Sequence, residues 1–71
     1  MIRTVVKVDG MACSMCEAHI NNAVRNRLHV KKVRSNRKRK ETVIESEQPL
    51  DREMISQAIE ETGYTFLGFE E

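Results

Sequence analysis

The stretch Gly10-Met11-Ala12-Cys13-Ser14-Met15-Cys16, which we call the cysteine loop, holds the only two cysteines of the 71-residue chain. It separates a segment typical of a β-strand from one typical of an α-helix. Two cysteines three positions apart can bring their sulfurs to one metal ion, and thiolates prefer Cu(I) or Zn(II) to hard ions such as Mg(II). A helix that begins beside the thiols also lowers their pKa, so that thiolate is accessible near neutral pH. The loop therefore predicts a metal site between the first strand and the first helix.

A cysteine pair at this spacing is also found in other sites. A structural zinc site needs four ligands, and no second cysteine pair is present. His19 and His29 are expected to be exposed to solvent rather than to bind metal. A disulfide closing so short a loop would add little stability. A thiol–disulfide oxidoreductase is the enzymatic alternative, but the chain is shorter than a thioredoxin fold needs and has no Gly-Pro between its cysteines. We therefore expect a protein that is not an enzyme.

Outward from the cysteine loop, the sequence predicts six elements. Residues 2–8 alternate between two faces, as in a half-buried strand. Ser14 and Glu17 fit a capping box, which predicts a helix that begins near Ser14. Two β-prone runs, 30–35 and 41–46, are joined by residues 36–40, plausible as a hairpin in which Ile44 points inward and Val43 outward. Asp51 can N-cap a second helix that ends before Gly63, and residues 64–69 predict a last strand, with Phe66 and Phe69 in the core.

The two helices have separate apolar and polar faces. The apolar stripe of the first helix comprises Cys16, Ile20, Ala23, Val24 and Leu28, and that of the second comprises Met54, Ile55, Ala58, Ile59 and Thr62. The residues of the first helix expected to face water are Glu17, His19, Asn21, Asn22 and Arg25. The order βαββαβ predicts one α+β domain over residues 1–71, a ferredoxin-like sandwich with two helices on one face of a four-stranded antiparallel sheet.

The charges are unevenly distributed along the chain. Nine of the twelve Lys and Arg residues lie in residues 25–40, which contain no Asp or Glu, whereas nine of the eleven acidic residues follow from Glu41 onward. The basic segment 31–40 has no interleaved aromatic residue, so we expect no nucleic-acid partner. No stretch resembles a signal peptide or approaches the length of a membrane span. These features predict a cytoplasmic protein with reduced thiols and no membrane insertion.

The cysteine loop matches the motif GMxCxxC, and the chain resembles the heavy-metal-associated domain family. This family includes small copper chaperones and the metal-binding domains of copper-transporting P-type ATPases. The positions that extend the match are Ile20, Val24, Ala58-Ile59 and Gly63-Tyr64. The resemblance implies that Cys13 and Cys16 bind one Cu(I) per monomer. It also implies that the copper passes to a P-type ATPase, or to its metal-binding domains, by exchange of thiolate ligands.

The resemblance also implies roles for residues around the metal. Met11 is expected to pack beneath the loop, although its thioether could contact copper, and Met15 is expected to be exposed. Tyr64 is expected to face the site, where it would shield the sulfurs or donate a hydrogen bond to a thiolate. Relatives that handle zinc or cadmium often have an acidic residue immediately before the first cysteine. Ala12 occupies that position here, which favours Cu(I).

Several alternatives stay open at this point. The chain could be an excised metal-binding domain of an ATPase, or a regulator that binds Zn(II), Hg(II) or Cd(II). Copper could also bridge two copies in a homodimer. Relatives usually have a glycine in the turn of the middle hairpin, whereas this chain has basic residues. We expect these charges to affect the encounter with an acidic partner rather than metal affinity, and the turn to lie either beside the cysteine loop or at the other end of the sheet.

Overall fold

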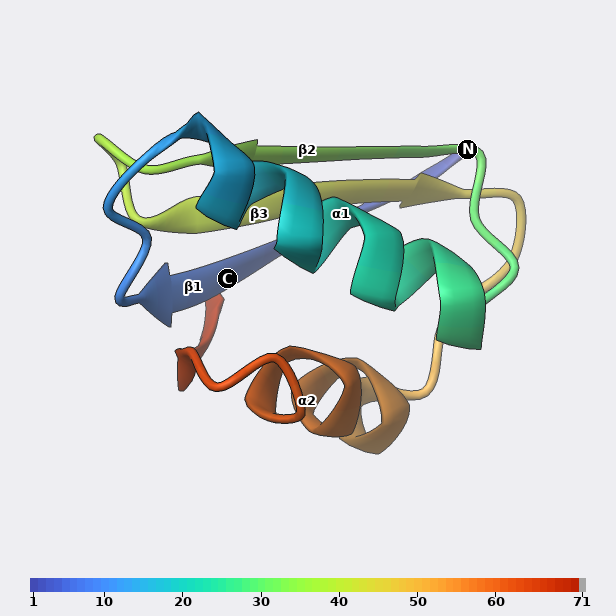
Figure 1. Ribbon diagram of the computed structural model, residues 1–71. Helices are drawn as coiled ribbons and strands as arrows, with labels where there is room; N and C mark the ends of the chain where they lie inside the picture. Colours follow the sequence, from blue (N-terminus) through green and yellow to red (C-terminus); the bar gives the residue numbers. More distant parts are fainter. Residues whose placement is uncertain (71) are drawn as a thin grey trace.

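The computed structural model, which describes residues 1–70, confirms the predicted order of elements (Figure 1). The elements are β1 (Ile2–Asp9), α1 (Ser14–Arg27), β2 (Lys32–Asn36), β3 (Glu41–Ser46), α2 (Arg52–Glu60) and β4 (Thr65–Glu70). The strands lie in the order β2-β3-β1-β4, and each neighbouring pair is antiparallel. Both helices cover the same face of the sheet, so the fold is the predicted ferredoxin-like sandwich. Along residues 1–70, no helix is long and apolar enough to cross a membrane.

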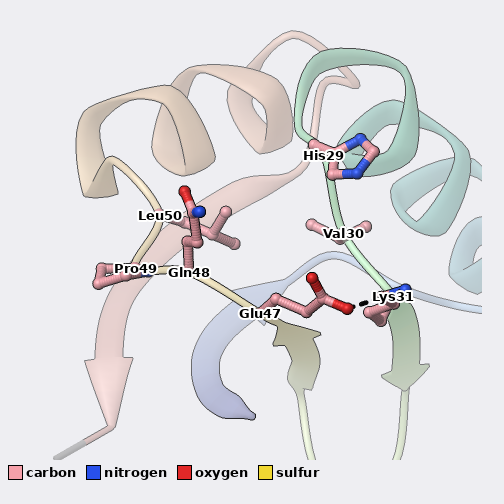
Figure 2. A pocket seen from close by; sticks show the side chains of 7 residues that line it. All are labelled: His29, Val30, Lys31, Glu47, Gln48, Pro49 and Leu50. Atoms are coloured by element: carbon pink, nitrogen blue, oxygen red, sulfur yellow. Dashed lines mark ion pairs between the residues drawn. The ribbon is translucent and has the colours of Figure 1, made fainter.

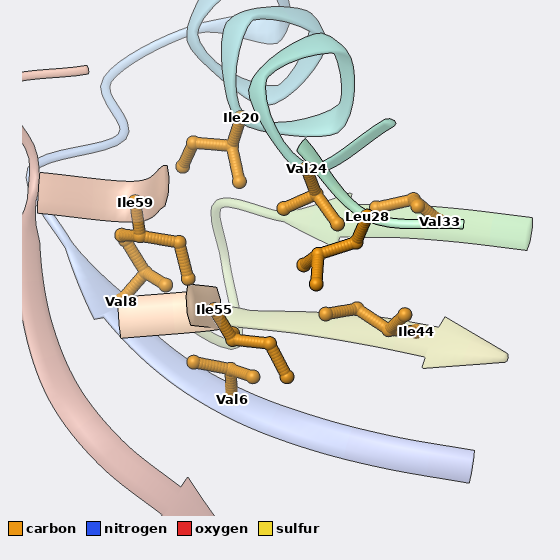
Figure 3. Close-up of a cluster of buried hydrophobic side chains, with 9 residues drawn as sticks. All are labelled: Val6, Val8, Ile20, Val24, Leu28, Val33, Ile44, Ile55 and Ile59. Atoms are coloured by element: carbon orange, nitrogen blue, oxygen red, sulfur yellow. The ribbon is translucent and has the colours of Figure 1, made fainter. Parts of the chain in front are cut away.

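The hydrophobic core lies between the sheet and the two helices (Figure 3). Its buried members are Val6, Val8, Ile20, Val24, Leu28, Val33, Ile44, Ile55 and Ile59. Ile44 is fully buried and Val43 is only partly so, which confirms the predicted orientation of β3. Phe66 and Phe69 are half-buried and pack against this cluster. Because burying an aliphatic side chain contributes about 1.5–3 kcal/mol, we expect these residues to form a core without a metal.

The helix α1 begins at Ser14, as predicted, but its cap differs from the prediction. The N-cap is Cys13, whose side chain makes no capping hydrogen bond, so Ser14 is the first helical residue and comes one position too late for a capping box. Glu17 does not face water but binds the turn that follows β2. Asn21 was also expected to face water, yet its Oδ1 accepts a hydrogen bond of 2.7 Å from the Ser35 hydroxyl in β2. One polar side of α1 therefore contacts the sheet edge.

The second helix begins as predicted. The Asp51 side chain accepts a hydrogen bond of 2.9 Å from the backbone N–H of Glu53. Met54, however, is 41% exposed rather than buried in the core. The core-facing stripe of this nine-residue helix is narrow. It consists of Ile55, Ala58 and Ile59, and a residue one position before Ile55 is rotated about 100° away from it.

The turn between β2 and β3, residues 37–40, is the basic turn. It lies beside the cysteine loop, because β3 runs antiparallel to β1 with Glu41 opposite Lys7 (Figure 1). The Asn36 Oδ1 accepts hydrogen bonds from the backbone N–H groups of Lys38 (2.9 Å) and Arg39 (3.1 Å). Lys40 has φ 56°, the left-handed conformation that usually favours glycine. The Asn36 side chain and Lys40 thus build this turn without a glycine.

Candidate metal centre

The cysteine loop begins at a glycine that the geometry requires. Gly10 has φ 102°, and its N–H donates a hydrogen bond of 2.9 Å to Asp9 Oδ1. A Cβ atom at this position would lie only 3.2 Å from Cδ1 of Tyr64. Glycine is therefore favoured both by the backbone conformation and by the close approach of the Tyr64 ring. This packing places the ring, which comes just before β4, against the start of the loop.

The two thiols sit at the junction of the loop and α1. Cys13 is exposed and is the N-cap, while Cys16 is partly buried in the first helical turn. The backbone N–H of Cys16 donates a hydrogen bond of 3.1 Å to the carbonyl of Cys13, which folds the chain so that the two Sγ atoms lie 3.5 Å apart. With metal–sulfur bonds of about 2.3 Å, one ion can bridge sulfurs up to about 4.6 Å apart. Both free thiols can therefore bind the same ion.

The electrostatic environment favours the thiolate of Cys16. Its pKa is lowered from 9.0 to about 7, and the largest cause is a hydrogen bond from the Tyr64 side chain. Hydrogen bonds with the backbone of Ala12 and with the Cys13 thiol lower this pKa further. The pKa of Tyr64 is raised, mainly because its hydroxyl hydrogen-bonds to Cys16. Tyr64 thus favours the thiolate form of Cys16, and its role in metal binding stays a prediction.

The lowered pKa of Cys16 leads to a testable pH dependence. In a Cys13→Ser background, which leaves one thiol, alkylation of Cys16 by iodoacetamide should accelerate as pH rises through the thiol pKa, because the thiolate is the nucleophile. Adding Tyr64→Phe removes the largest cause of the lowering, so the midpoint of the rate profile should move to higher pH. Identical midpoints with and without the Tyr64 hydroxyl would contradict this arrangement.

Apart from the two cysteines, the methionine and histidine side chains considered as ligands form no metal-binding cluster with the thiols. Met11 packs against the hydrophobic core, and Met15 is 68% exposed. His19 and His29 are exposed, as expected. Among residues 1–70, no group of three or more His, Cys, Asp and Glu side chains could hold a metal ion. The described part of the chain therefore offers a site of two thiols, which suits an ion that accepts few ligands.

A hollow of about 320 Å³ lies at the opposite end of the molecule from the cysteine loop (Figures 1 and 2). The connections from α1 to β2 and from β3 to α2 form it, with the lining residues His29, Val30, Lys31, Glu47, Gln48, Pro49 and Leu50. The Lys31 Nζ and the Glu47 carboxylate form an ion pair of 3.0 Å there. The hollow contains neither cysteine, so it is separate from the thiol site.

These features define a small metal-binding domain with an accessible thiol pair. The family model for the heavy-metal-associated domain matches residues 5–65, so the chain belongs to the heavy-metal-associated domain family. Among curated proteins, no sequence matches the chain.

Three solved structures illustrate the similarity. The N-terminal domain of ZntA in the apo-form is 28% identical, with 97% of this chain and 92% of that chain covered and a TM-score of 0.83. The CopZ metallochaperone is 21% identical, with 93% and 100% covered and a TM-score of 0.85. The yeast copper transporter domain Ccc2a, solved in the apo and Cu(I)-loaded states, is 23% identical, with 97% and 94% covered and a TM-score of 0.84. All three share the fold of this chain. The N-terminal domain of ZntA in the Zn(II)-form also matches, at 27% identity, with 93% of this chain and 89% of that chain covered and a TM-score of 0.81.

Proposed function

We propose that this protein is a cytoplasmic carrier, not an enzyme, that binds one Cu(I) through Cys13 and Cys16 and delivers it to a copper-transporting P-type ATPase. The observation that carries the proposal is the pair of accessible sulfurs 3.5 Å apart, with no cluster of further ligands among residues 1–70. Soft thiolates select Cu(I) or Zn(II) over hard ions, so the number of ligands has to separate the two. Protein zinc sites instead take three or four side-chain ligands, and Ala12 supplies no oxygen ligand beside Cys13.

Delivery follows from the exposure of the site. Cys13 is exposed, so a thiolate of a partner's cysteine pair can approach a copper ion held on the loop. The partner sulfur forms a bond to Cu(I), giving three sulfur ligands, and one bond to this protein then breaks. The second exchange completes the transfer, with copper in the same oxidation state throughout. Affinity and rapid transfer are compatible because copper never leaves its sulfur ligands.

A binding competition tests the metal. The N-terminal domain of ZntA in the Zn(II)-form is 27% identical to this chain, and this similarity makes zinc the main alternative to copper. With Cu(I) and Zn(II) chelators of known affinity, we expect one tightly bound Cu(I) per chain and much weaker Zn(II) binding. Zinc bound as tightly as copper would contradict the assignment to copper.

The basic turn should speed the encounter with an acidic partner. Lys38 is exposed, and Arg39 is 75% exposed with only a long contact of 3.8 Å to Glu41. Exposed charges act on association mainly through steering, over a Debye length of about 8 Å at physiological salt. Replacing both by serine should leave Cu(I) affinity unchanged and slow copper transfer to an acidic metal-binding domain of a copper ATPase.

The salt dependence supplies the control for this transfer experiment. The difference in transfer rate between the double variant and the unmodified protein, followed by stopped-flow mixing, should shrink as ionic strength rises. A difference that persists at high salt would show that the two side chains do not act by steering. Absence of any transfer from the unmodified protein would contradict delivery itself.

A further inference from the structure

The basic turn is attached to both ends of the cysteine loop. Asp9 immediately precedes the loop, and its Oδ1 lies 3.6 Å from Lys40 Nζ. Glu17 immediately follows the loop, and its Oε2 accepts a hydrogen bond of 2.8 Å from the backbone N–H of Arg37. The Arg37 guanidinium also lies 3.4 Å from Glu17 Oε1. A segment some twenty residues away along the chain thus holds the entry and the exit of the metal-binding loop.

The backbone reinforces this attachment at the entry to the loop. The N–H of Val8 donates a hydrogen bond of 2.8 Å to the carbonyl of Lys40, which fixes the end of β1 against the turn. The turn itself is held by the two hydrogen bonds to Asn36 Oδ1. The basic turn is therefore attached to the end of β1 and to Asn36 rather than being a free loop.

The exit of the loop depends more on this support. The N-cap Cys13 makes no side-chain capping bond, so the first turn of α1 lacks the usual anchor. Glu17 lies in that turn and its side chain is only 20% exposed, so its bond from the Arg37 N–H is a charge-assisted hydrogen bond in a partly desolvated place. The Asp9–Lys40 pair is weaker, because both side chains are more than half exposed.

We propose that the basic turn is a brace that holds the cysteine loop in its metal-binding geometry, with Glu17 and Arg37 as the main positioning residues. The inference rests on the proposed function, because the geometry it preserves is that of the two thiols. A ligand set held in place before binding loses less conformational freedom when the ion arrives. Without the brace, the loop must be ordered at the expense of binding, so that the metal is held less tightly and released faster. In this proposal Lys38 and Arg39 act on the encounter with the partner, whereas Arg37 supports the site through Glu17.

The direction in which Glu17→Ala changes Cu(I) binding distinguishes structural support by Glu17 from the effect of its charge. Removing the negative charge of Glu17 beside Cys16 would, by charge alone, favour the thiolates and tighten metal binding. Removing the brace should instead weaken metal binding. We expect Glu17→Ala to release Cu(I) to an excess of a chelator about tenfold faster than the unmodified protein, the lower end of the effect that the loss of a charge-assisted hydrogen bond produces. Glu17→Gln, which keeps an oxygen acceptor for the Arg37 N–H, should restore most of the slow release.

A matched control contacts the other end of the same helix. Glu61, the C-cap residue of α2, forms an ion pair with Arg27 at the C-terminal end of α1. Glu61→Ala also removes a glutamate paired with an arginine, but it should leave Cu(I) release unchanged, whatever its effect on the melting temperature. Hydrogen exchange of the metal-free protein gives a second readout. The amides of Cys16 and Glu17, which bond to the Cys13 carbonyl, should exchange faster in Glu17→Ala and not in Glu61→Ala.

The outcomes distinguish this inference from the proposed function. Release at the unmodified rate or slower in Glu17→Ala, or equal effects of Glu17→Ala and Glu61→Ala, would overturn the brace and leave the copper site standing. Failure of the unmodified protein to bind Cu(I) would overturn the proposed function. In that case hydrogen exchange in the metal-free protein still decides whether the turn orders the loop.

Discussion

Replacing Cys13 or Cys16 by serine should abolish high-affinity Cu(I) binding. The two thiols are the only cysteines in the chain, so no other thiolate can take over. A serine hydroxyl is a hard donor that stays protonated at neutral pH, and soft Cu(I) gains little from it. Four-ligand zinc sites bind with about 10–16 kcal/mol, or roughly 3 kcal/mol for each ligand, so the loss of one of two thiolates should weaken binding by about a hundredfold or more.

Competition with a Cu(I) chelator measures this loss directly. Met15→Ala is the matched control, because Met15 lies between the two cysteines and is 68% exposed. It should bind copper as the unmodified protein does. The circular dichroism spectra of all these metal-free variants should coincide. A double cysteine variant that keeps the original affinity would contradict the two-thiol site.

Truncating Ile44 to alanine should remove most of the stability of the metal-free protein. Ile44 is fully buried in β3, an inner strand of the sheet, and belongs to the core cluster (Figure 3). An Ile→Ala change in a core costs about 2–5 kcal/mol. A domain this small has a free energy of unfolding near the lower end of about 5–15 kcal/mol, so the variant should be close to unfolding.

Urea unfolding without metal tests this prediction, because we expect the core to form without an ion. Val43→Ala is the neighbouring control. Val43 lies on the open face of β3 and is only partly buried, so its truncation should cost distinctly less. Equal losses at the two positions would contradict the placement of the core. An unmodified protein that gains its helical signal only on addition of copper would contradict folding before metal binding.

The parts of this structure that the sequence predicts are those marked by a pattern among residues close together in the chain. Alternation in β1 places Val6 and Val8 in the core, and the spacing of Cys13 and Cys16 beside a helix start identifies the thiol pair. The brace has no such signal. Glu17 and Arg37 are distant in the sequence, and the polar side of α1 looks like a solvated face when only apolar periodicity is considered.

The position of the basic turn was undecided for a related reason. Its place depends on where the middle hairpin reverses, and the turn contains no glycine to mark that point. The pairing of Lys7 with Glu41 fixes it beside the cysteine loop. Once this register is known, Asp9 and Lys40 become neighbours, although neither residue suggests the other in the sequence. The position of the basic turn thus depends on the pairing of β1 with β3, which local sequence patterns do not reveal.

X-ray absorption at the copper edge, recorded on the protein loaded with one equivalent of Cu(I), tests the central claim most directly. The account predicts that copper stays in the Cu(I) state and that its nearest neighbours are sulfur atoms only, since Cys13 and Cys16 lie 3.5 Å apart and no cluster of other ligands surrounds them in residues 1–70. The same spectrum should be lost from the Cys13→Ser/Cys16→Ser variant. A first shell of nitrogen or oxygen atoms in the unmodified protein would contradict copper binding by the two thiols.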